Sequence, residues 1–215
     1  MKRTLAIVLS ILLLGTLATG LAGAGETTQP LTSANAQKQE TSFGDLVADA
    51  LCQVSGATIA LVPAVSFKSG TIPPGPVTLA NVKPLLTKYS EVWAVSKLSG
   101  AQLRAALERS VSRAPNPNSG FLQVSGLSLT YNPEEPRDQR IVSLLASGAE
   151  VQPDAQYQVA MPVSLAKGGS GYFEIFGEDD IATTGSDEMA ALIVAYVDAQ
   201  GTVAPTGQGR INVGQ

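Results

Sequence analysis

Helical and strand-like patterns follow one another in an irregular order from residue 38 to the C-terminal end of this chain. A strict alternation of strand and helix would favour a doubly wound parallel sheet, whereas successive strands separated by turns favour hairpins. The order therefore predicts an α+β fold, with mixed β-sheets packed against helices in a single domain. Ser42 and Thr78 are the predicted N-caps of the first two helices. The predicted helices cover 43–51, 78–86, 99–111 and 187–198, and the predicted strands cover 57–62, 92–98, 122–124, 127–131, 140–145, 157–163 and 210–213.

The N-terminal segment has the order of a secretory signal. Lys2 and Arg3 precede an apolar run over 5–14, and Ala22-Gly23-Ala24 supplies the small residues of a cleavage site. The sequence predicts a signal peptide over 1–24 that is removed after Ala24. The alternative is an uncleaved membrane anchor, for which the apolar stretch is only just long enough. Cleavage predicts a secreted, periplasmic or cell-envelope protein without stable membrane insertion.

The rest of the chain divides into a spacer and one domain. Residues 25–37 are polar, small and aperiodic, which predicts a flexible linker, and 38–213 form the predicted domain. Cys52 is the only cysteine, so no internal disulfide can form, and a chain of this length can bury enough apolar surface without one. We expect Cys52 to be a small buried residue on a helix.

Charge and composition exclude several classes of function. The net charge is −4, and removal of Lys2 and Arg3 with the signal changes it to −6, which disfavours binding to nucleic acid or anionic lipid. The chain contains no histidine, which dinuclear phosphoesterase centres and Ser-His-Asp or Cys-His nucleophile sites require. No metal site and no cofactor are predicted.

Two short motifs are candidates for chemistry. Magnesium favours oxygen ligands, so the acidic run 178–180 is one candidate site, but three adjacent carboxylates without a chelating loop are typical of a solvated turn. Ser164 and Lys167 match S-x-x-K, which requires a helix, and the glycines that follow at once favour coincidence.

Three segments together carry a resemblance to a known family. The run FGDLVADA over 43–50 resembles the opening helix of the 5′-nucleotidase C-terminal domain. GFLQVSGL over 120–127, with TYNP over 130–133, resembles its central hairpin. LAKGGSGY over 165–172 resembles its L-A-x-G-G-D-G-Y loop. Together with Thr184-Gly185, the similarity covers residues 38 to 212, which identifies the chain as a member of that family and implies its fold.

In this family the N-terminal domain carries the metals, and the C-terminal domain binds the nucleoside by stacking its base between two aromatic rings. Those positions are altered here. The resemblance places Lys68 at an arginine position, Tyr89 at one stacking ring, Glu91 at an asparagine and Ser164 at the second ring. Lysine cannot form the bidentate fork of arginine, and the carboxylate of Glu91 would repel a phosphate. The candidate substrate-binding residues are therefore Lys68, Tyr89, Glu91, Ser164, Gly168, Gly169 and Ser170, the last at the loop aspartate.

The resemblance and the altered positions leave three hypotheses. The first is a stand-alone, non-catalytic exported domain with a degenerate pocket for a nucleoside or nucleotide-like molecule. The second is an accessory subunit that completes a separately encoded metallophosphatase, which would leave an exposed apolar patch around Tyr172, Phe173 and Phe176. The third, autonomous phosphohydrolase activity, requires a metal site that the sequence does not offer.

Overall fold

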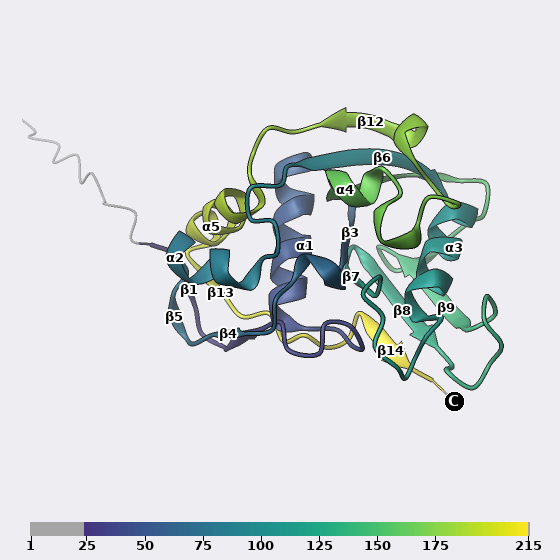
Figure 1. Cartoon of the computed structure of the whole chain (residues 1–215), viewed down its shortest axis with the longest axis horizontal. Helices are drawn as coiled ribbons and strands as arrows, with labels where there is room; N and C mark the ends of the chain where they lie inside the picture. The colour runs from purple at the N-terminus through teal and green to yellow at the C-terminus, as the bar shows by residue number, and fades with distance from the viewer. Residues whose placement is uncertain (1–23, 215) are drawn as a thin grey trace, which may run out of the picture.

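The computed structural model describes residues 24–214 and is built around a five-stranded sheet (Figure 1). Its strand order is β12-β6-β11-β3-β7. Strands β11 and β3 run parallel, and the other neighbouring pairs are antiparallel. The sheet is therefore mixed, as the sequence predicted. The strands are β12 (Ile181–Thr184), β6 (Trp93–Ser99), β11 (Gln156–Pro162), β3 (Ile59–Pro63) and β7 (Leu122–Ser125).

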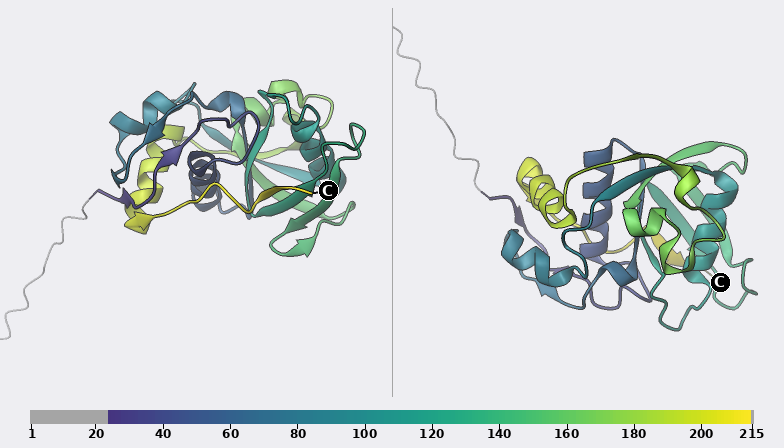
Figure 2. Two further views of the ribbon diagram at one scale, coloured as in Figure 1. Left: turned by 90° about the horizontal axis from the view of Figure 1, so that it is seen from below. Right: turned by 45° about the horizontal axis from the view of Figure 1, so that its top comes forward.

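This sheet separates two hydrophobic cores. Successive side chains of β3 point to opposite faces, so Ile59 and Leu61 join one core while Ala60 and Val62 join the other. Helices α1 (Ser42–Ser55) and α5 (Met189–Gln200) cover one face, and helix α3 (Gly100–Val111) lies on the other (Figures 1 and 2). Because β3 is buried on both faces, it reads as a continuous apolar run in the sequence.

A second sheet lies on the α3 side of the molecule, with the order β10-β9-β8-β14. Its last strand pairs in parallel with β8, so the C-terminal segment crosses the molecule to reach it (Figure 2). Leu127, Leu129 and Tyr131 alternate inward along β8 and enter the same core as α3. The strands are β10 (Ala149–Glu150), β9 (Ile141–Ala146), β8 (Leu127–Tyr131) and β14 (Ile211–Val213).

The helix caps differ in one place from the sequence prediction. Thr41, and not Ser42, is the N-cap of α1, and its hydroxyl accepts the Gly44 N–H at 3.2 Å. The Ser42 hydroxyl instead donates to the carbonyl of Pro30 at 2.9 Å. The predicted helix over 78–86 is short: α2 (Leu79–Val82) is followed by the 3-10 turn η2 (Lys83–Leu85), since Pro84 does not donate a backbone hydrogen bond. Its predicted cap, Thr78, is confirmed.

Residues 25–37 do not form the predicted flexible linker. They contain β1 (Glu26–Thr27), which pairs with β5 (Gly75–Pro76) and β13 (Thr202–Val203), and β2 (Leu31–Thr32), which pairs with β4 (Thr71–Ile72). Leu31 is fully buried. Local composition predicted a linker because the partners that order this segment lie far away in the sequence.

Two further predictions concern the N-terminal segment and Cys52. The signal predicted over 1–24 lies outside the described residues except for Ala24. None of the helices within 24–214 combines the length and the apolar character needed to cross a bilayer. Cys52 lies on α1 as predicted but is only partly buried, and this burial raises the pKa of its thiol.

Candidate ligand-binding site

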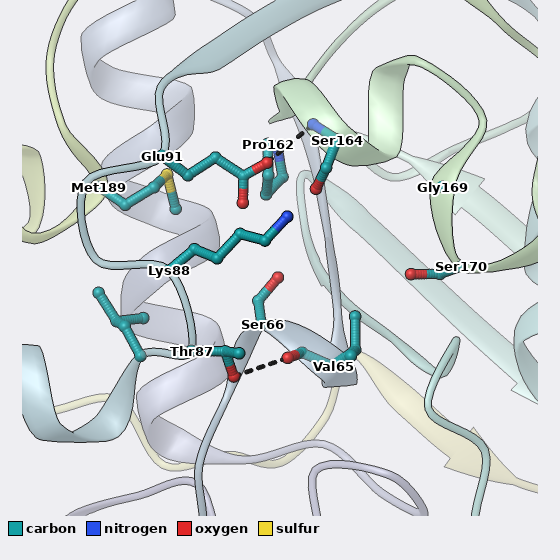
Figure 3. A pocket seen from close by; sticks show the side chains of 11 residues that line it. Val65, Ser66, Thr87, Lys88, Glu91, Pro162, Ser164, Gly169, Ser170 and Met189 are labelled. Carbon is teal, nitrogen blue, oxygen red and sulfur yellow. Dashed lines mark hydrogen bonds between the residues drawn. The ribbon is translucent and has the colours of Figure 1, made fainter.

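A cavity of about 230 Å³ opens where the ends of β6 and β11 meet several loops (Figure 3). One wall comes from the 3-10 turn η1 (Ala64–Ser66) and the loop that follows η2. The opposite wall comes from helix α4 (Val163–Ala166) and the turn η3 (Gly169–Gly171). The lining residues are Val65, Ser66, Leu86, Thr87, Lys88, Glu91, Pro162, Ser164, Gly169, Ser170 and Met189.

The structure brings several of the predicted site residues together in this cavity. Glu91, Ser164, Gly169 and Ser170 line it, although Glu91 and Ser164 are separated by 73 residues in the sequence. Gly168 does not line the cavity but begins the turn that does. The prediction that these positions share one site is thus consistent with the geometry. That they bind substrate stays a prediction.

Lys68 and Tyr89 are not among the lining residues. The Lys68 side chain is exposed, while its backbone N–H donates to the Leu85 carbonyl at 2.9 Å. The Tyr89 ring is 45% exposed and lies 5.0 Å from the ammonium of Lys83, in a cation–π contact outside the cavity. The expected stacking ring therefore does not line this cavity.

Lys88 lines the cavity, and sequence reasoning missed it. Its side chain extends into the space between Ser66 and Ser164 (Figure 3). Within residues 24–214, its ammonium forms no ion pair and no hydrogen bond. The resemblance placed the important ring at the next residue, Tyr89, and the irregular loop has no period from which the direction of either side chain could be read.

Glu91 has a structural role as well as a place in the cavity. One of its carboxylate oxygens, Oε1, accepts the backbone N–H of Ser164 at 2.8 Å (Figure 3). This contact joins the loop before β6 to the start of α4 and fixes one edge of the cavity. The other carboxylate oxygen has no hydrogen bond to the described residues and faces the cavity.

The turn that contains Ser170 has an unusual backbone. Ser170 has φ +58°, in the left-handed region that side chains other than glycine rarely adopt. Such a conformation costs on the order of 1 kcal/mol and persists only where the surroundings impose it. A Cβ on Gly169 would approach the carbonyl oxygen of Ser164 to 2.4 Å, so glycine is required there. The Ser170 hydroxyl points toward the cavity (Figure 3).

Helix α3 and a buried tyrosine hold this turn in place. The Arg109 guanidinium donates to the carbonyls of Ser170 at 3.2 Å and of Gly171 at 3.4 Å, and lies 5.7 Å from the Tyr172 ring. The Tyr172 hydroxyl donates to the carbonyl of Gly120 at 2.6 Å. Burial raises the pKa of this hydroxyl strongly. These contacts impose the strained backbone of Ser170.

The predicted apolar patch around Tyr172, Phe173 and Phe176 is mostly wrong. Tyr172 is fully buried and Phe176 is 3% exposed, and their rings stack at 5.4 Å inside the core. Only Phe173 is exposed, at 71%. The three residues lie on successive short turns, so their spacing in the sequence did not indicate which of them faces inward.

The two short motifs that were candidates for chemistry form contacts with each other. The ammonium of Lys167 lies 2.8 Å from the Glu178 carboxylate, and this hydrogen-bonded pair lowers the pKa of Glu178. Lys167 is therefore paired with a carboxylate on the surface. Residues 178–180 form a 3-10 turn, in which Asp180 accepts the Gly177 N–H at 2.9 Å. Across residues 24–214, no group of three or more His, Cys, Asp or Glu side chains is placed to hold a metal ion.

Comparisons with known proteins show to which family the chain belongs. The sequence profile described as 5′-nucleotidase, C-terminal domain matches residues 16–178. A snake venom 5′-nucleotidase from Naja atra is 28% identical over 145 residues, which cover 64% of this chain and 27% of that protein. The trifunctional nucleotide phosphoesterase protein YfkN from Bacillus subtilis is 27% identical over 192 residues, which cover 80% of this chain and 12% of that protein.

The fold comparison leads to the same family. The crystal structure of a 5′-nucleotidase precursor from Thermus thermophilus superposes with a TM-score of 0.80 and 28% sequence identity. The match covers 88% of this chain and 39% of that one. The chain therefore corresponds to only part of its relatives, and the profile match spans most of its length. This chain belongs to the 5′-nucleotidase C-terminal domain family.

Proposed function

We propose that this chain is an exported ligand-binding domain of the 5′-nucleotidase type that does not hydrolyse phosphate esters by itself. Its cavity, in this proposal, binds a nucleotide-like small molecule with an altered set of contacts. The observation that carries the proposal is the convergence of Glu91, Ser164 and Ser170 on one cavity, at the positions that the family resemblance assigned to ligand binding.

Two features support a ligand-binding role over plain packing. The strained backbone of Ser170 is held by specific contacts from Arg109, and strain of this kind concentrates at functional sites. The cavity combines apolar walls with a small number of polar groups, which is the usual composition of a small-molecule site. The lack of hydrolysis rests on the sequence, which offers no imidazole for a two-metal centre.

Titration calorimetry of the protein with AMP and with adenosine tests the binding role. Heat of binding with AMP is expected, and a Glu174→Gln variant, altered outside this cavity, should bind AMP equally well. No heat with either ligand would refute binding of nucleotides and nucleosides by this cavity. Phosphate release from AMP in the presence of Mg²⁺, Mn²⁺ or Zn²⁺ should stay at the level of the buffer. Release above that level would refute the non-catalytic role.

A second candidate function is that of an accessory subunit for a separately encoded metallophosphatase domain. Two exposed apolar side chains beside the cavity favour it: Val65, which lines the cavity and is 46% exposed, and Phe173. Phe173 packs against Gly168 at the start of the cavity turn, where a Cβ would lie 2.6 Å from the Phe173 Cα. Exposed apolar groups around a binding cavity are suited to contact with a second domain.

Analytical ultracentrifugation with a purified metallophosphatase domain from the same source tests this candidate. A complex should form, and Phe173→Ser should weaken it, whereas Val142→Ser should not. Val142 is 61% exposed but lies on β9, away from the cavity. Absence of a complex, or equal effects of the two substitutions, would argue against the accessory role.

A further inference from the structure

The ligand-binding proposal leaves open which part of a nucleotide the cavity recognises. None of the described residues that line the cavity is aromatic, so a base cannot be stacked between rings there. The volume of about 230 Å³ lies below the range of about 300–1,000 Å³ that is usual for drug-sized ligands. Both facts favour a ligand smaller than a whole nucleotide.

The polar groups of the cavity indicate the chemistry of that ligand. Lys88 presents an ammonium that forms no ion pair or hydrogen bond within the described part of the chain. Ser66, Ser164 and Ser170 add hydroxyl groups that can donate and accept. Glu91 offers the carboxylate oxygen that Ser164 does not use. One cation and several hydroxyl partners suit an anion that also carries many hydroxyl groups.

The remaining wall of the cavity fits the same kind of molecule. Leu86, Pro162 and Met189 form an apolar surface against which the C–H face of a sugar ring can pack. The Thr87 hydroxyl donates to the Val65 carbonyl at 2.8 Å and is therefore already engaged as a donor (Figure 3). The groups left for a ligand are the Lys88 ammonium, the Glu91 oxygen and the three serine hydroxyls.

We propose that this cavity binds an anionic monosaccharide, such as a sugar phosphate or a sugar acid, with Lys88 paired to the anionic group. Glu91 accepts a hydrogen bond from a sugar hydroxyl, and the serine hydroxyls bind the remaining oxygens. A nucleotide would bind through its ribose phosphate, with the base outside the cavity. This inference rests on the proposed binding function and assigns the determinant of specificity to Lys88, a residue outside the predicted set.

Calorimetric titration of the protein with ribose 5-phosphate, gluconate, ribose, AMP and adenosine tests the inference. Ribose 5-phosphate or gluconate should bind roughly tenfold more tightly than ribose, because a charge-assisted contact is lost with the neutral sugar. Binding of one or both anions supports anionic monosaccharides as the ligand class and identifies the preferred anionic group. AMP should bind no more tightly than ribose 5-phosphate.

A matched pair of variants separates the contact of Lys88 from a general effect of charge. Lys88→Met should weaken binding of the anionic sugar by roughly tenfold, whereas Lys97→Met, on the exposed side of β6, should leave it unchanged. Because Lys88 is exposed, circular dichroism should show both variants folded. Unchanged affinity in Lys88→Met would overturn the assignment.

Two outcomes separate this inference from the function on which it rests. Adenosine and AMP binding without any response to ribose 5-phosphate or gluconate would overturn the sugar inference and leave the ligand-binding function standing. Absence of binding heat with all five compounds would overturn the ligand-binding function itself.

Discussion

Glu40 and Asp45 hold the C-terminal segment against the start of α1 with buried carboxyl groups, which are 4% and 2% exposed. Oxygen Oε2 of Glu40 accepts the backbone N–H groups of Arg210 at 2.9 Å and Ile211 at 2.8 Å. Oxygen Oδ2 of Asp45 accepts the Gly207 N–H at 3.1 Å. The other oxygens, Oε1 of Glu40 and Oδ1 of Asp45, are buried without a hydrogen-bond partner among the described residues.

We expect a proton on Asp45, because a protonated Oδ1 can donate to the Glu40 carboxylate and so give both unpaired oxygens a partner. Burial raises the pKa of Asp45 from 3.8 to about 8, and the nearby charges of Glu40 and Asp49 add to the rise. Arg210 opposes it, but its Nε lies 3.7 Å from Asp45 while its two terminal nitrogens pair with Asp49 at 2.8 Å. We therefore expect Asp45 to be protonated in the folded protein at neutral pH.

The sign and size of the pH dependence follow from this pKa. The folded state keeps the Asp45 proton up to about pH 8, whereas the unfolded chain loses it near pH 3.8. Between these values the unfolded state binds fewer protons, so the free energy of unfolding falls as pH rises. The stabilisation that comes from the raised pKa of Asp45 is fully present below pH 3.8. One proton corresponds to about 1.4 kcal/mol per pH unit, or about 4 kcal/mol between pH 5 and pH 8.

Asp45→Asn tests this reasoning because an amide cannot ionise, yet its nitrogen can donate to Glu40. Urea unfolding at pH 5, 6, 7 and 8 should show that the wild type loses stability relative to Asp45→Asn as pH rises. The difference between the two slopes of unfolding free energy against pH should approach the value for one proton per molecule. Asp179→Asn, at an exposed position, should follow the wild type. Parallel curves for the wild type and Asp45→Asn would refute a buried proton on Asp45.

Three further substitutions test the scaffold of the cavity and the N-terminal segment. Gln123→Leu should lower the free energy of unfolding by about 3 kcal/mol in urea titrations, because the Thr41 N–H and two backbone carbonyls lose their hydrogen bonds to this buried amide. Gln53→Leu, on the surface, should leave the stability unchanged. Tyr172→Phe should cost about 1–2 kcal/mol in thermal unfolding, since the Gly120 carbonyl loses its donor; no loss would mean that this contact is not formed. Ser170→Gly should change the free energy of unfolding by less than about 1 kcal/mol, since relief of backbone strain offsets the greater entropy of the unfolded chain. The same substitution should weaken ligand binding in calorimetry, and unchanged affinity would exclude the Ser170 hydroxyl from the site.

Elements with strong local patterns could be predicted from the sequence. The helix over 99–111 has regular apolar spacing and an N-cap at Ser99, whose hydroxyl accepts the Gln102 N–H at 3.2 Å. The buried strand before Pro63 is a continuous apolar run ended by a proline. In both cases the information lies within a few residues, which is why pattern and structure agree.

Structure that depends on contacts between residues far apart in the sequence could not be predicted. Residues 25–37 have no apolar period, but the Gly25 N–H donates to Asp198 at 2.7 Å and the Gln123 amide binds the Ala36 carbonyl at 3.1 Å. The same limit applies to the cavity, where Glu91 and Ser164 meet across 73 residues. Only the family resemblance brought these residues into one site, and it could not show that Lys88 lines the cavity while Tyr89 does not.

Glu91 offers a way to separate the charge of the cavity from its hydrogen bonds. In Glu91→Gln the amide oxygen should accept the Ser164 N–H, which needs an acceptor, so the amide nitrogen faces the cavity as a donor. Inorganic phosphate should then bind roughly threefold more tightly, because a like charge is removed in a solvent-screened site. Ribose should bind more weakly, because the acceptor for its hydroxyl is lost.

Calorimetry with phosphate and with ribose, each at low salt, compares the two effects in one variant. Glu150→Gln, on the exposed strand β10, serves as the control for net charge and should change neither affinity. A gain for phosphate with unchanged binding of ribose would mean that Glu91 acts only through its charge and contacts no sugar hydroxyl. A gain for phosphate with a loss for ribose would place the sugar hydroxyls against Glu91, because the loss of a charge alone cannot weaken the binding of a neutral sugar.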